Sequence, residues 1–340
     1  MKVYITGNQG FIGKNLSKYL KCLKYNVVED QDFDEIAIVN QRVDIKNNYA
    51  ILLSEFKRLG VTHVVHCAAI VGTDVCALDY KETISTNVLG TYNISLACKE
   101  LNIPLIYIGT TVIYDTFRYQ DSYITEESHI DPKTLYGLTK YQGEQYVKLN
   151  CQVSGYCILR PLFCYGGIGD MNSLIAKTIY NYLYSAKGFS IFLDVEKYKD
   201  YMHVSDFCSA IEIVLRTGMF NNEDYNISLK DPCKTSHVLS LIDKVYESTY
   251  KPKYYGLEPS KFIQFHPETD YLGNHRVSNN KFVEATRGLW YPKVHVFEGI
   301  KMVFKELDNF SKENYNPLKY LDQIKENNIN IKQYYPQNAI

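Results

Sequence analysis

A tyrosine and a lysine, Tyr136 and Lys140, are four residues apart in the segment TLYGLTKYQGE, which covers residues 134–144. On a helix this spacing places both side chains on one face, one turn apart. A phenol has a reference pKa near ~10, so it is a poor base at neutral pH unless a neighbouring ammonium group lowers that value. The pair therefore predicts base catalysis. Because tyrosine and lysine are abundant here, the pair alone fits ordinary helix surface equally well, and the interpretation needs a cofactor site beside it.

The N-terminal residues have the pattern of such a cofactor site. Residues 3–6, VYIT, form a predicted strand, and a G-x-x-G-x-x-G sequence of Gly7, Gly10 and Gly13 follows at once. A helical pattern of leucines comes next. Strand, glycine turn and helix in this order are the context of the dinucleotide fingerprint, in which the pyrophosphate lies at the helix N-terminus. The sequence therefore predicts a bound dinucleotide.

The second predicted strand, residues 25–30, ends in acidic residues. A carboxylate at this point accepts hydrogen bonds from both hydroxyls of an adenosine ribose and repels a 2′-phosphate, which favours NAD over NADP. Asp30 is the first candidate for this role, Glu29 and Asp32 are alternatives, and a solvated acidic loop explains the same residues. Asp44, in the third predicted strand, is a candidate acceptor for the adenine amino group.

Two later predicted strands also end in residues suited to a ligand site. The strand at 62–66 runs into Ala68 and Ala69, whose small side chains let a backbone pass close to a cofactor. The strand at 104–109 runs into Thr110. Because the carboxyl ends of strands in an open α/β sheet face the ligand crevice, we expect Thr110 to share a substrate hydroxyl with Tyr136.

Two polar residues inside apolar segments call for a structural explanation. Asn87 lies in a helical segment predicted around residues 80–101, where asparagine has poor helix propensity, and this indicates a buried hydrogen bond. His66 lies in an apolar strand without nearby ligand residues, so we interpret it as a core histidine.

The order of the predicted elements indicates an α/β fold. Strands and helices alternate through residue 160, which is typical of a doubly wound parallel sheet of the Rossmann type. Beyond it the rhythm changes, and helical patterns separated by short strands predict a smaller mixed α/β lobe at the C-terminal side. These helical patterns lie near residues 172–186, 204–217, 235–249 and 294–308. We expect a cofactor domain at 1–160, which elements from 200–230 rejoin, a substrate lobe at 161–310 and a tail at 311–340.

The composition of the chain excludes several classes of protein. The 340 residues are 46% hydrophobic and 22% charged, with a formal net charge of −1, as in soluble globular proteins. No long basic run predicts a nucleic-acid partner, and no apolar stretch approaches the ~18 residues of a membrane span. The N-terminus has no hydrophobic leader, which argues against secretion. Nine scattered cysteines without a C-x-x-C predict reduced thiols in a cytoplasmic protein, with no disulfide framework and no metal site.

In combination, several segments resemble the extended short-chain dehydrogenase/reductase family, in particular its NAD-dependent nucleotide-sugar epimerases and dehydratases. The segments are TGNQGFIG, HCAA, STNVLGT, GTTVIY, YGLTK, LRPLFCYGG and KDYMHVSDF, and the resemblance extends to about residue 308. It implies that Tyr136 is the catalytic base, that Lys140 binds the nicotinamide ribose and lowers the tyrosine pKa, and that Thr110 orients the sugar hydroxyl. The cofactor-binding residues that it implies are Gly7, Gly10, Phe11, Ile12, Gly13, Asp30, Asp44, Ile45, Ala68, Ala69, Asn87, Tyr136, Lys140 and Pro161.

The same resemblance implies a nucleotide-diphosphate sugar as substrate, held by the second lobe. Candidate substrate residues are Thr111, Phe163, Lys199 and Arg276, the last because GNHRVSNNKF resembles a phosphate-side segment of GDP-mannose 3,5-epimerases. Phe163 replaces an asparagine of most members, and Lys199 replaces an arginine. Lysine keeps the charge but loses the bidentate fork for phosphate. The two departures predict an altered pocket, and neutral drift is the alternative.

The residues after Thr110 narrow the predicted reaction. The 4,6-dehydratases of the resembled family place Asp-Glu there, whereas this chain has Thr111 and Val112, which cannot do acid–base work at neutral pH. What remains is 4-epimerisation with Thr110, Tyr136, Lys140 and NAD. A dehydratase or a 4-keto reductase is the alternative, and a non-catalytic NAD-binding sensor is a remote one. The resemblance also implies a homodimer formed through the helix that carries Tyr136.

Overall fold

The computed structural model describes most of the chain. Asp30, Asp44 and the predicted tail at 311–340 lie outside the described residues, so what the sequence predicts for them stays a prediction. Ile45 is described, in a turn, while the rest of the third predicted strand is outside. The structure describes residues 1–29, 45–46, 49–167, 169–170, 173–184, 189–191, 193–251, 263–267, 270 and 272–309.

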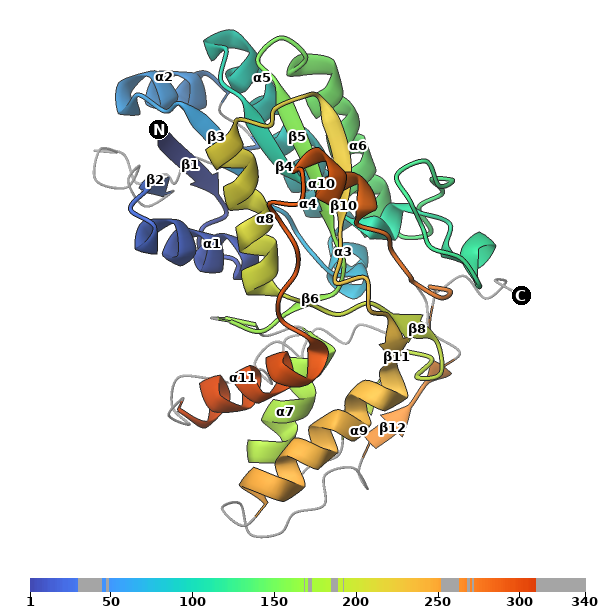
Figure 1. Ribbon diagram of the computed structural model, residues 1–340. Coiled ribbons are helices and arrows are strands. Elements are labelled where there is room, and N and C mark those ends of the chain that lie inside the picture. Colours follow the sequence, from blue (N-terminus) through green and yellow to red (C-terminus); the bar gives the residue numbers. More distant parts are fainter. Residues whose placement is uncertain are drawn as a thin grey trace.

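A six-stranded sheet in the order β10-β5-β4-β3-β1-β2 forms the centre of the upper half of the molecule in Figure 1. Every neighbouring pair in it is parallel. The chain moves from β1 outward to β2 and then returns to the other side of β1, so the topological switch point lies between β1 and β3. The strands are β1 (Lys2–Thr6), β2 (Asn26–Glu29), β3 (His63–His66), β4 (Leu105–Ile108), β5 (Tyr156–Pro161) and β10 (Glu223–Ile227).

Helices cover both faces of this sheet, because successive strand residues point to opposite sides and both sides are apolar. Val3 and Ile5 pack with α1 (Phe11–Cys22) and α8 (Val204–Thr217) on one face. Tyr4 packs on the other face in a cluster to which α2 (Tyr49–Leu59), α5 (Thr91–Leu101) and α6 (Leu135–Asn150) contribute. The predicted doubly wound parallel fold is confirmed.

The segment between β3 and α5 is helical but not uniformly α-helical. It contains α3 (Thr73–Leu78), α4 (Tyr80–Ile84) and a π-helical stretch, Ser85–Gly90, that leads directly into α5. The predicted helix around 80–101 is therefore present, with a widened turn at Asn87. Such π-helical turns occur often at functional sites.

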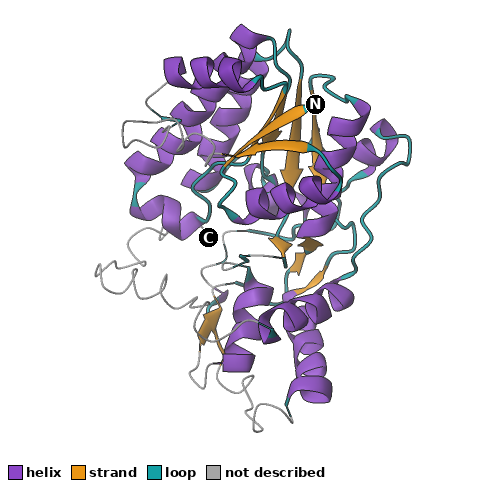
Figure 2. Ribbon diagram, turned by 90° about the vertical axis from the view of Figure 1, so that its left-hand side faces the viewer, coloured by secondary structure: helices purple, strands orange, loops and turns teal. Residues whose placement is uncertain are grey.

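The second half of the chain adds a smaller helical layer below the sheet (Figure 1). There α7 (Leu174–Tyr184), α9 (Thr235–Val245) and α11 (Val296–Asp308) bury a common apolar cluster. Short strand pairs accompany this layer. The pairs β6 (Cys164–Tyr165) with β9 (Met202–His203) and β8 (Tyr198–Lys199) with β11 (Cys233–Lys234) lie between it and the sheet, whereas the pair β7 (Phe189–Ile191) with β12 (Ile263–Phe265) lies at the side of the helices (Figure 2).

The four helices predicted after residue 161 are all present. Two elements of this half return to the sheet: α8 packs against α1, and β10 extends the sheet beside β5, with the short helix α10 (Asn280–Ala285) next to it. Among the described residues, no helix has the combined length and apolar character that crossing a bilayer requires.

Candidate active site

The glycine turn after β1 packs directly against the loop after β3. Gly7 has a φ of +65°, and a Cβ at this position would lie 2.7 Å from the Cα of Ala68. A Cβ on Gly13 would lie 2.3 Å from the Gly7 carbonyl oxygen. Any side chain would therefore clash at both positions, and Gly7 also has a backbone conformation that favours glycine. The turn and the Ala68 loop meet at the switch point of the sheet, where ligands of such folds bind.

The N-terminus of α1 is suited to an anion. Gly10 is the N-cap residue and supplies no capping side chain, and the first turn contains no acidic residue. The backbone N–H groups and the helix dipole at this end favour a negative group such as a pyrophosphate. Phe11 and Ile12, which open the helix, are half-buried against the core between sheet and helices. The predicted pyrophosphate site is thus a tight turn with uncapped amides.

Asn87 holds the loop after β3 in place. Its Oδ1 accepts a hydrogen bond from the Ile70 N–H (2.8 Å), and its Nδ2 donates to the Ile70 carbonyl (3.0 Å) and to the Thr139 hydroxyl (3.1 Å). The side chain is completely buried, so the predicted buried hydrogen bond is confirmed. Asn87 thereby links the loop that contains Ala68 and Ala69 to helix α6. Its contact with a cofactor remains a prediction.

Two further residues of the predicted cofactor site have structural surroundings that can be described. Ile45 packs into the space beside Gly90, where a Cβ would lie 2.7 Å from the Ile45 Cδ1. Pro161 ends β5, and its carbonyl accepts a long hydrogen bond from the Thr111 hydroxyl (3.5 Å).

His66 is a core histidine, as predicted. Its Nδ1 is 2.6 Å from the Thr6 hydroxyl and its Nε2 is 3.0 Å from the Thr91 hydroxyl. Burial lowers the pKa of His66 to about 3, and the nearby charge of Lys140 acts in the same direction. The imidazole is therefore neutral at physiological pH. Its two nitrogens connect β3 to β1 through Thr6 and to α5 through Thr91.

The predicted helix that carries Tyr136 and Lys140 is α6. Thr134 caps it, with its hydroxyl accepting from the Gly137 N–H (3.1 Å). A Cβ on Gly137 would lie 3.0 Å from the carbonyl oxygen of Val112, so the first turn of α6 lies directly against the 3₁₀ turn that follows Thr110. The structure thus brings the Thr110 segment beside the half-buried Tyr136.

Lys140 lies one turn further along α6 and is 3% exposed. Its Nζ is 4.1 Å from the centroid of the Tyr107 ring, a cation–π distance. Burial lowers the pKa of Lys140 to about 8, and the Glu144 carboxylate opposes this shift. The side chain is therefore mostly charged at pH 7, which is the state that stabilises a nearby phenolate.

The four predicted substrate residues have different surroundings. Thr111 is completely buried. Lys199 is also completely buried, in an ion pair with Asp270 (3.2 Å), and burial lowers the pKa of this lysine. The guanidinium group of Arg276 lies over the Tyr198 ring, 4.1 Å from its centroid. The contacts of Thr111 and Lys199 are thus with protein groups, and their role toward a substrate remains a prediction.

Phe163 has a backbone conformation that is unusual for its residue type. Its φ is +32°, in the region that glycine and asparagine adopt most easily. The half-buried ring makes an edge contact with His275, with centroids 5.6 Å apart, and lies 5.9 Å from the Lys199 Nζ. The backbone at this position therefore has a conformation suited to asparagine, although the residue is a phenylalanine.

Two groups of buried polar residues were not predicted from the sequence. Glu144 and Arg160 form a buried ion pair, and His275 is completely buried beside Phe163. A signal existed for the first group, because Glu144 follows Lys140 at the same four-residue spacing and Arg160 interrupts an otherwise apolar strand. The position of His275 in an irregular segment provided no comparable signal.

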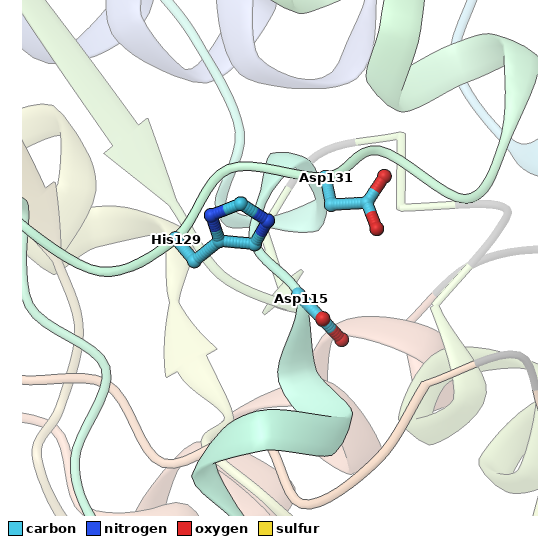
Figure 3. Close-up of side chains that lie close together, drawn as sticks. All are labelled: Asp115, His129 and Asp131. Atoms are coloured by element: carbon cyan, nitrogen blue, oxygen red, sulfur yellow. The ribbon is translucent and has the colours of Figure 1, made fainter.

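Three side chains at the loop before α6 lie close together: Asp115, His129 and Asp131 (Figure 3). One potential donor atom of each lies within 4.8 Å of the others. Asp115 already pairs with the Nε of Arg118 (2.9 Å), and Asp131 pairs with Lys133. Because each carboxylate has a cationic partner, the cluster does not by itself indicate a metal site.

A comparison with protein-family models matches residues 3–228 to the NAD dependent epimerase/dehydratase family. The chain belongs to this family. The match includes the glycine turn, the Asn87 segment, Thr110 and helix α6, and the NAD dependence of the family confirms the predicted cofactor. The uncapped glycine turn at α1 fits such a dinucleotide.

Relatives within the family have several activities. An uncharacterized UDP-glucose epimerase of Bacillus subtilis, YtcB, is 26% identical over 265 residues, which are 72% of this chain and 82% of that protein. The fold is similar to dTDP-glucose 4,6-dehydratase of Bacillus anthracis in complex with NAD (TM-score 0.75, 23% identity, 94% of this chain and 99% of the other). It is equally similar to UDP-glucose 4-epimerase of Thermus thermophilus (TM-score 0.74, 22% identity, 92% and 100%). At these identities the solved structures establish the fold alone.

Proposed function

We propose that this chain is an NAD-dependent epimerase of a nucleotide-diphosphate sugar and that it inverts C4 through a transient 4-keto sugar. The observation that carries the proposal is the contact between the turn after Thr110 and the first turn of α6, with the mostly charged Lys140 one turn below Tyr136. This arrangement fits a phenol that exchanges protons with a sugar hydroxyl at the end of β4.

In the proposed reaction, Tyr136 takes the proton of the C4 hydroxyl while Thr110 orients that hydroxyl. Lys140 stabilises the phenolate form of Tyr136 beforehand by its positive charge. The glycine turn at the N-terminus of α1 would hold NAD, which would supply hydride acceptance from C4 and hydride return to the opposite face of the sugar. Tyr136 then gives the proton back to the C4 oxygen. Protons and hydride are thus conserved over one turnover.

The residues after Thr110 support epimerisation over dehydration. A dehydratase needs an acid for the leaving hydroxyl and a base for C5. Here the positions are Thr111, which is completely buried with its hydroxyl toward the Pro161 carbonyl, and Val112. Dehydration or 4-keto reduction remains the second candidate, since the relatives of this chain include a dehydratase.

We extend the proposal to the binding partners. The nucleotide-diphosphate sugar would lie between the sheet and the helical layer, with Arg276 as a diphosphate ligand and Phe163 at the sugar. A cytoplasmic homodimer would form through α6 and its neighbours, where Leu89, Leu138 and Leu149 are exposed apolar residues. No nucleic acid or membrane partner is proposed.

The test is turnover of a panel of UDP-, GDP- and dTDP-hexoses by the purified protein with NAD, with products identified by NMR. We expect one C4 epimer pair to interconvert without net change in absorbance at 340 nm. Tyr136→Phe should lower kcat by about 10²–10⁴-fold. Tyr146→Phe, on the same helix but in edge contact with the Tyr92 ring, should retain the parent rate.

Two results would contradict the proposal. No epimer from any sugar of the panel would exclude this reaction for the tested substrates, and accumulation of NADH or its stoichiometric consumption would identify a dehydrogenase or reductase. Parent activity in Tyr136→Phe would remove the tyrosine from the mechanism.

A further inference from the structure

A buried ion pair links the helix of the predicted catalytic residues, α6, to strand β5. Glu144 is on α6, one turn beyond Lys140, and Arg160 is in β5. The Nε of Arg160 donates to one carboxylate oxygen of Glu144 (3.1 Å) and the Nη2 donates to the other (2.8 Å). Both side chains are at most 1% exposed. This bidentate geometry fixes the carboxylate in position and orientation.

The pair also packs against the backbone that leads to Thr110. A Cβ on Gly109 would lie 2.5 Å from the Oε1 of Glu144 and 3.0 Å from the Cγ of Arg160. Glycine at this position therefore makes room for the pair. Because Gly109 immediately precedes Thr110, any shift of the ion pair is transmitted to the residue predicted to orient the sugar hydroxyl.

The remaining donors of Arg160 connect the pair to two more elements. Its Nη1 donates to the Tyr114 hydroxyl (2.6 Å), and that hydroxyl donates to the Asn226 Oδ1 (3.0 Å). The same Nη1 is 2.6 Å from the Oδ2 of Asp224, which also pairs with Lys148 (2.9 Å). Two cations and two anions are thus balanced inside the network, and each buried charge has a partner, which is the condition for burying an ion pair stably.

Several groups surround the ammonium of Lys140. The ring of Tyr107 on β4 and the neutral His66 on β3 lie beside it. The thiols of Cys67 and Cys76 also act on its pKa. Burial raises the pKa of the Cys76 thiol to about 11, so this thiol is neutral at pH 7. Tyr136, one turn away, is the remaining acidic group.

Glu144 supplies the carboxylate among the groups that act on the pKa of Lys140. It also contributes the largest of the influences that raise the pKa of Lys140. The bidentate contact with Arg160 holds this carboxylate in place on the side of α6 that also carries Lys140.

We propose that Glu144 and Arg160 are positioning residues of the reaction, which hold α6 and the end of β4 in register and keep Lys140 in its charged form. The proposal rests on the proposed function of Tyr136 and Lys140. In this arrangement Arg160 maintains the position of Glu144, and Glu144 extends the pH range in which Lys140 remains an ammonium group.

The first experiment is the pH dependence of kcat for Glu144→Gln, which removes the charge and keeps the shape. Without the carboxylate, the pKa of Lys140 falls, so we expect the alkaline limb of the profile to move down by about one pH unit. KM near pH 6.5 should change little. Asp224→Asn is the matched control, because it disturbs the same network from β10 and should leave the limb in place. An unshifted limb in Glu144→Gln would overturn the proposal.

Arg160→Lys tests the positioning role should the glutamine variant not fold. It keeps the positive charge but loses the bidentate fork. We expect kcat to fall about tenfold with KM and the alkaline limb close to the parent. A parent kcat in this variant would overturn the positioning role.

A second experiment needs no turnover. Glu144→Gln and Lys140→Met are combined in a double-mutant cycle of urea unfolding. At pH 6.5, where Lys140 is charged, the unfolding constants should depart from additivity by about tenfold, equivalent to one pKa unit of interaction. At pH 9.5 the departure should vanish. Additivity at both pH values would overturn the proposal, whereas pH-dependent coupling in a protein that turns over no sugar would refute only the proposed reaction.

Discussion

Two completely buried histidines, His66 and His275, have opposite surroundings. His66 is in the central sheet, and its two nitrogens are within hydrogen-bonding distance of the Thr6 and Thr91 hydroxyls. His275 is in the second half of the chain beside Phe163, and neither of its nitrogens makes a well-aligned hydrogen bond to a described residue, while a weak contact with the Thr111 backbone slightly opposes the effect of burial on its pKa. Burial lowers the pKa of both to about 3. Both imidazoles are therefore neutral, but His66 replaces its lost hydration with two protein hydrogen bonds, more fully than His275 does.

The same contrast extends to other buried polar atoms. In the described part of the second half, unpartnered atoms include the Oδ2 of Asp200, the Nε2 of His203 and the Nε of Arg276. In the described part of the glycine turn and sheet they belong to Asn8 and Asn226. Buried polar atoms without partners are costly and uncommon, so their concentration on one side calls for an explanation. It fits the substrate role proposed for the second half, because a bound nucleotide-diphosphate sugar would supply partners for these groups.

The two buried ion pairs, Arg160 with Glu144 and Lys199 with Asp270, also differ in how well their hydrogen bonds are satisfied. Arg160 and Glu144 meet through two hydrogen bonds, and the coulombic attraction of Glu144 raises the pKa of Arg160 against the opposing effect of burial. Lys199 reaches Asp270 at 3.2 Å and two backbone carbonyls at 3.3–3.4 Å, and burial lowers its pKa. A planar guanidinium satisfies a buried carboxylate better than a single ammonium group does.

The largest expected effect compares these two ion pairs. Arg160→Met should lower the free energy of unfolding by about 3–5 kcal/mol, because it leaves Glu144 buried without its cation. Lys199→Met should cost less, about 1–3 kcal/mol, because Asp270 keeps hydrogen bonds from the Asp194 and Leu272 N–H groups. Urea unfolding at pH 7 measures both. Equal losses would show that the two pairs contribute alike.

The next effect compares the two histidines. His66→Phe removes the partner of two buried threonine hydroxyls and should cost about 2–3 kcal/mol. His275→Phe replaces an imidazole without a well-aligned partner by a ring of similar size and should change the free energy of unfolding by less than about 1 kcal/mol. Urea unfolding of both variants and of the parent measures these two changes in the free energy of unfolding. A larger loss in His275→Phe would mean that His275 has a structural partner.

The pH dependence should be the same for both histidines despite their different hydrogen bonds. The unfolded chain takes up a proton near pH 6.5, whereas the folded chain resists it until about pH 3. Stability is therefore lost as the pH falls below 6.5, by up to about 1.4 kcal/mol per pH unit and histidine. Unfolding measured from pH 7 to pH 5 should show a smaller loss in either phenylalanine variant. An unchanged slope would mean that the replaced histidine has the same pKa in the folded and the unfolded chain.

The smallest effect concerns the backbone at Phe163. Its positive φ is unfavourable for a phenylalanine, so Phe163→Asn should recover about 1 kcal/mol of backbone strain, less the contacts of the lost ring. Phe163→Leu is the control, because it removes the ring and keeps the strain. Thermal unfolding of the two variants should rank asparagine above leucine. The reverse order would show that packing outweighs strain here.

Local spacing in the sequence was enough to predict the elements near the cofactor. The glycine turn, the helix with Tyr136 and Lys140, the hydrogen-bonded Asn87 and the core position of His66 all follow from patterns within a few residues. These features depend on backbone conformation and on hydrophobic periodicity, which neighbouring residues determine. The same reasoning located the four longest described helices of the second half, α7, α8, α9 and α11, because each has an apolar face, but not the short helix α10.

The partners of buried polar groups were decided only by the tertiary structure. The sequence does not indicate which acidic residue pairs with Arg160. In the folded chain β5 lies beside β4 and under α6, and this places Arg160 at Glu144. Lys199 was expected at a phosphate and is enclosed with Asp270, 71 residues away in the chain. The sequence by itself thus determined the elements and the cofactor turn, since both are local. The free energy of a buried charge depends on what surrounds it in space, and only the packed chain specifies that.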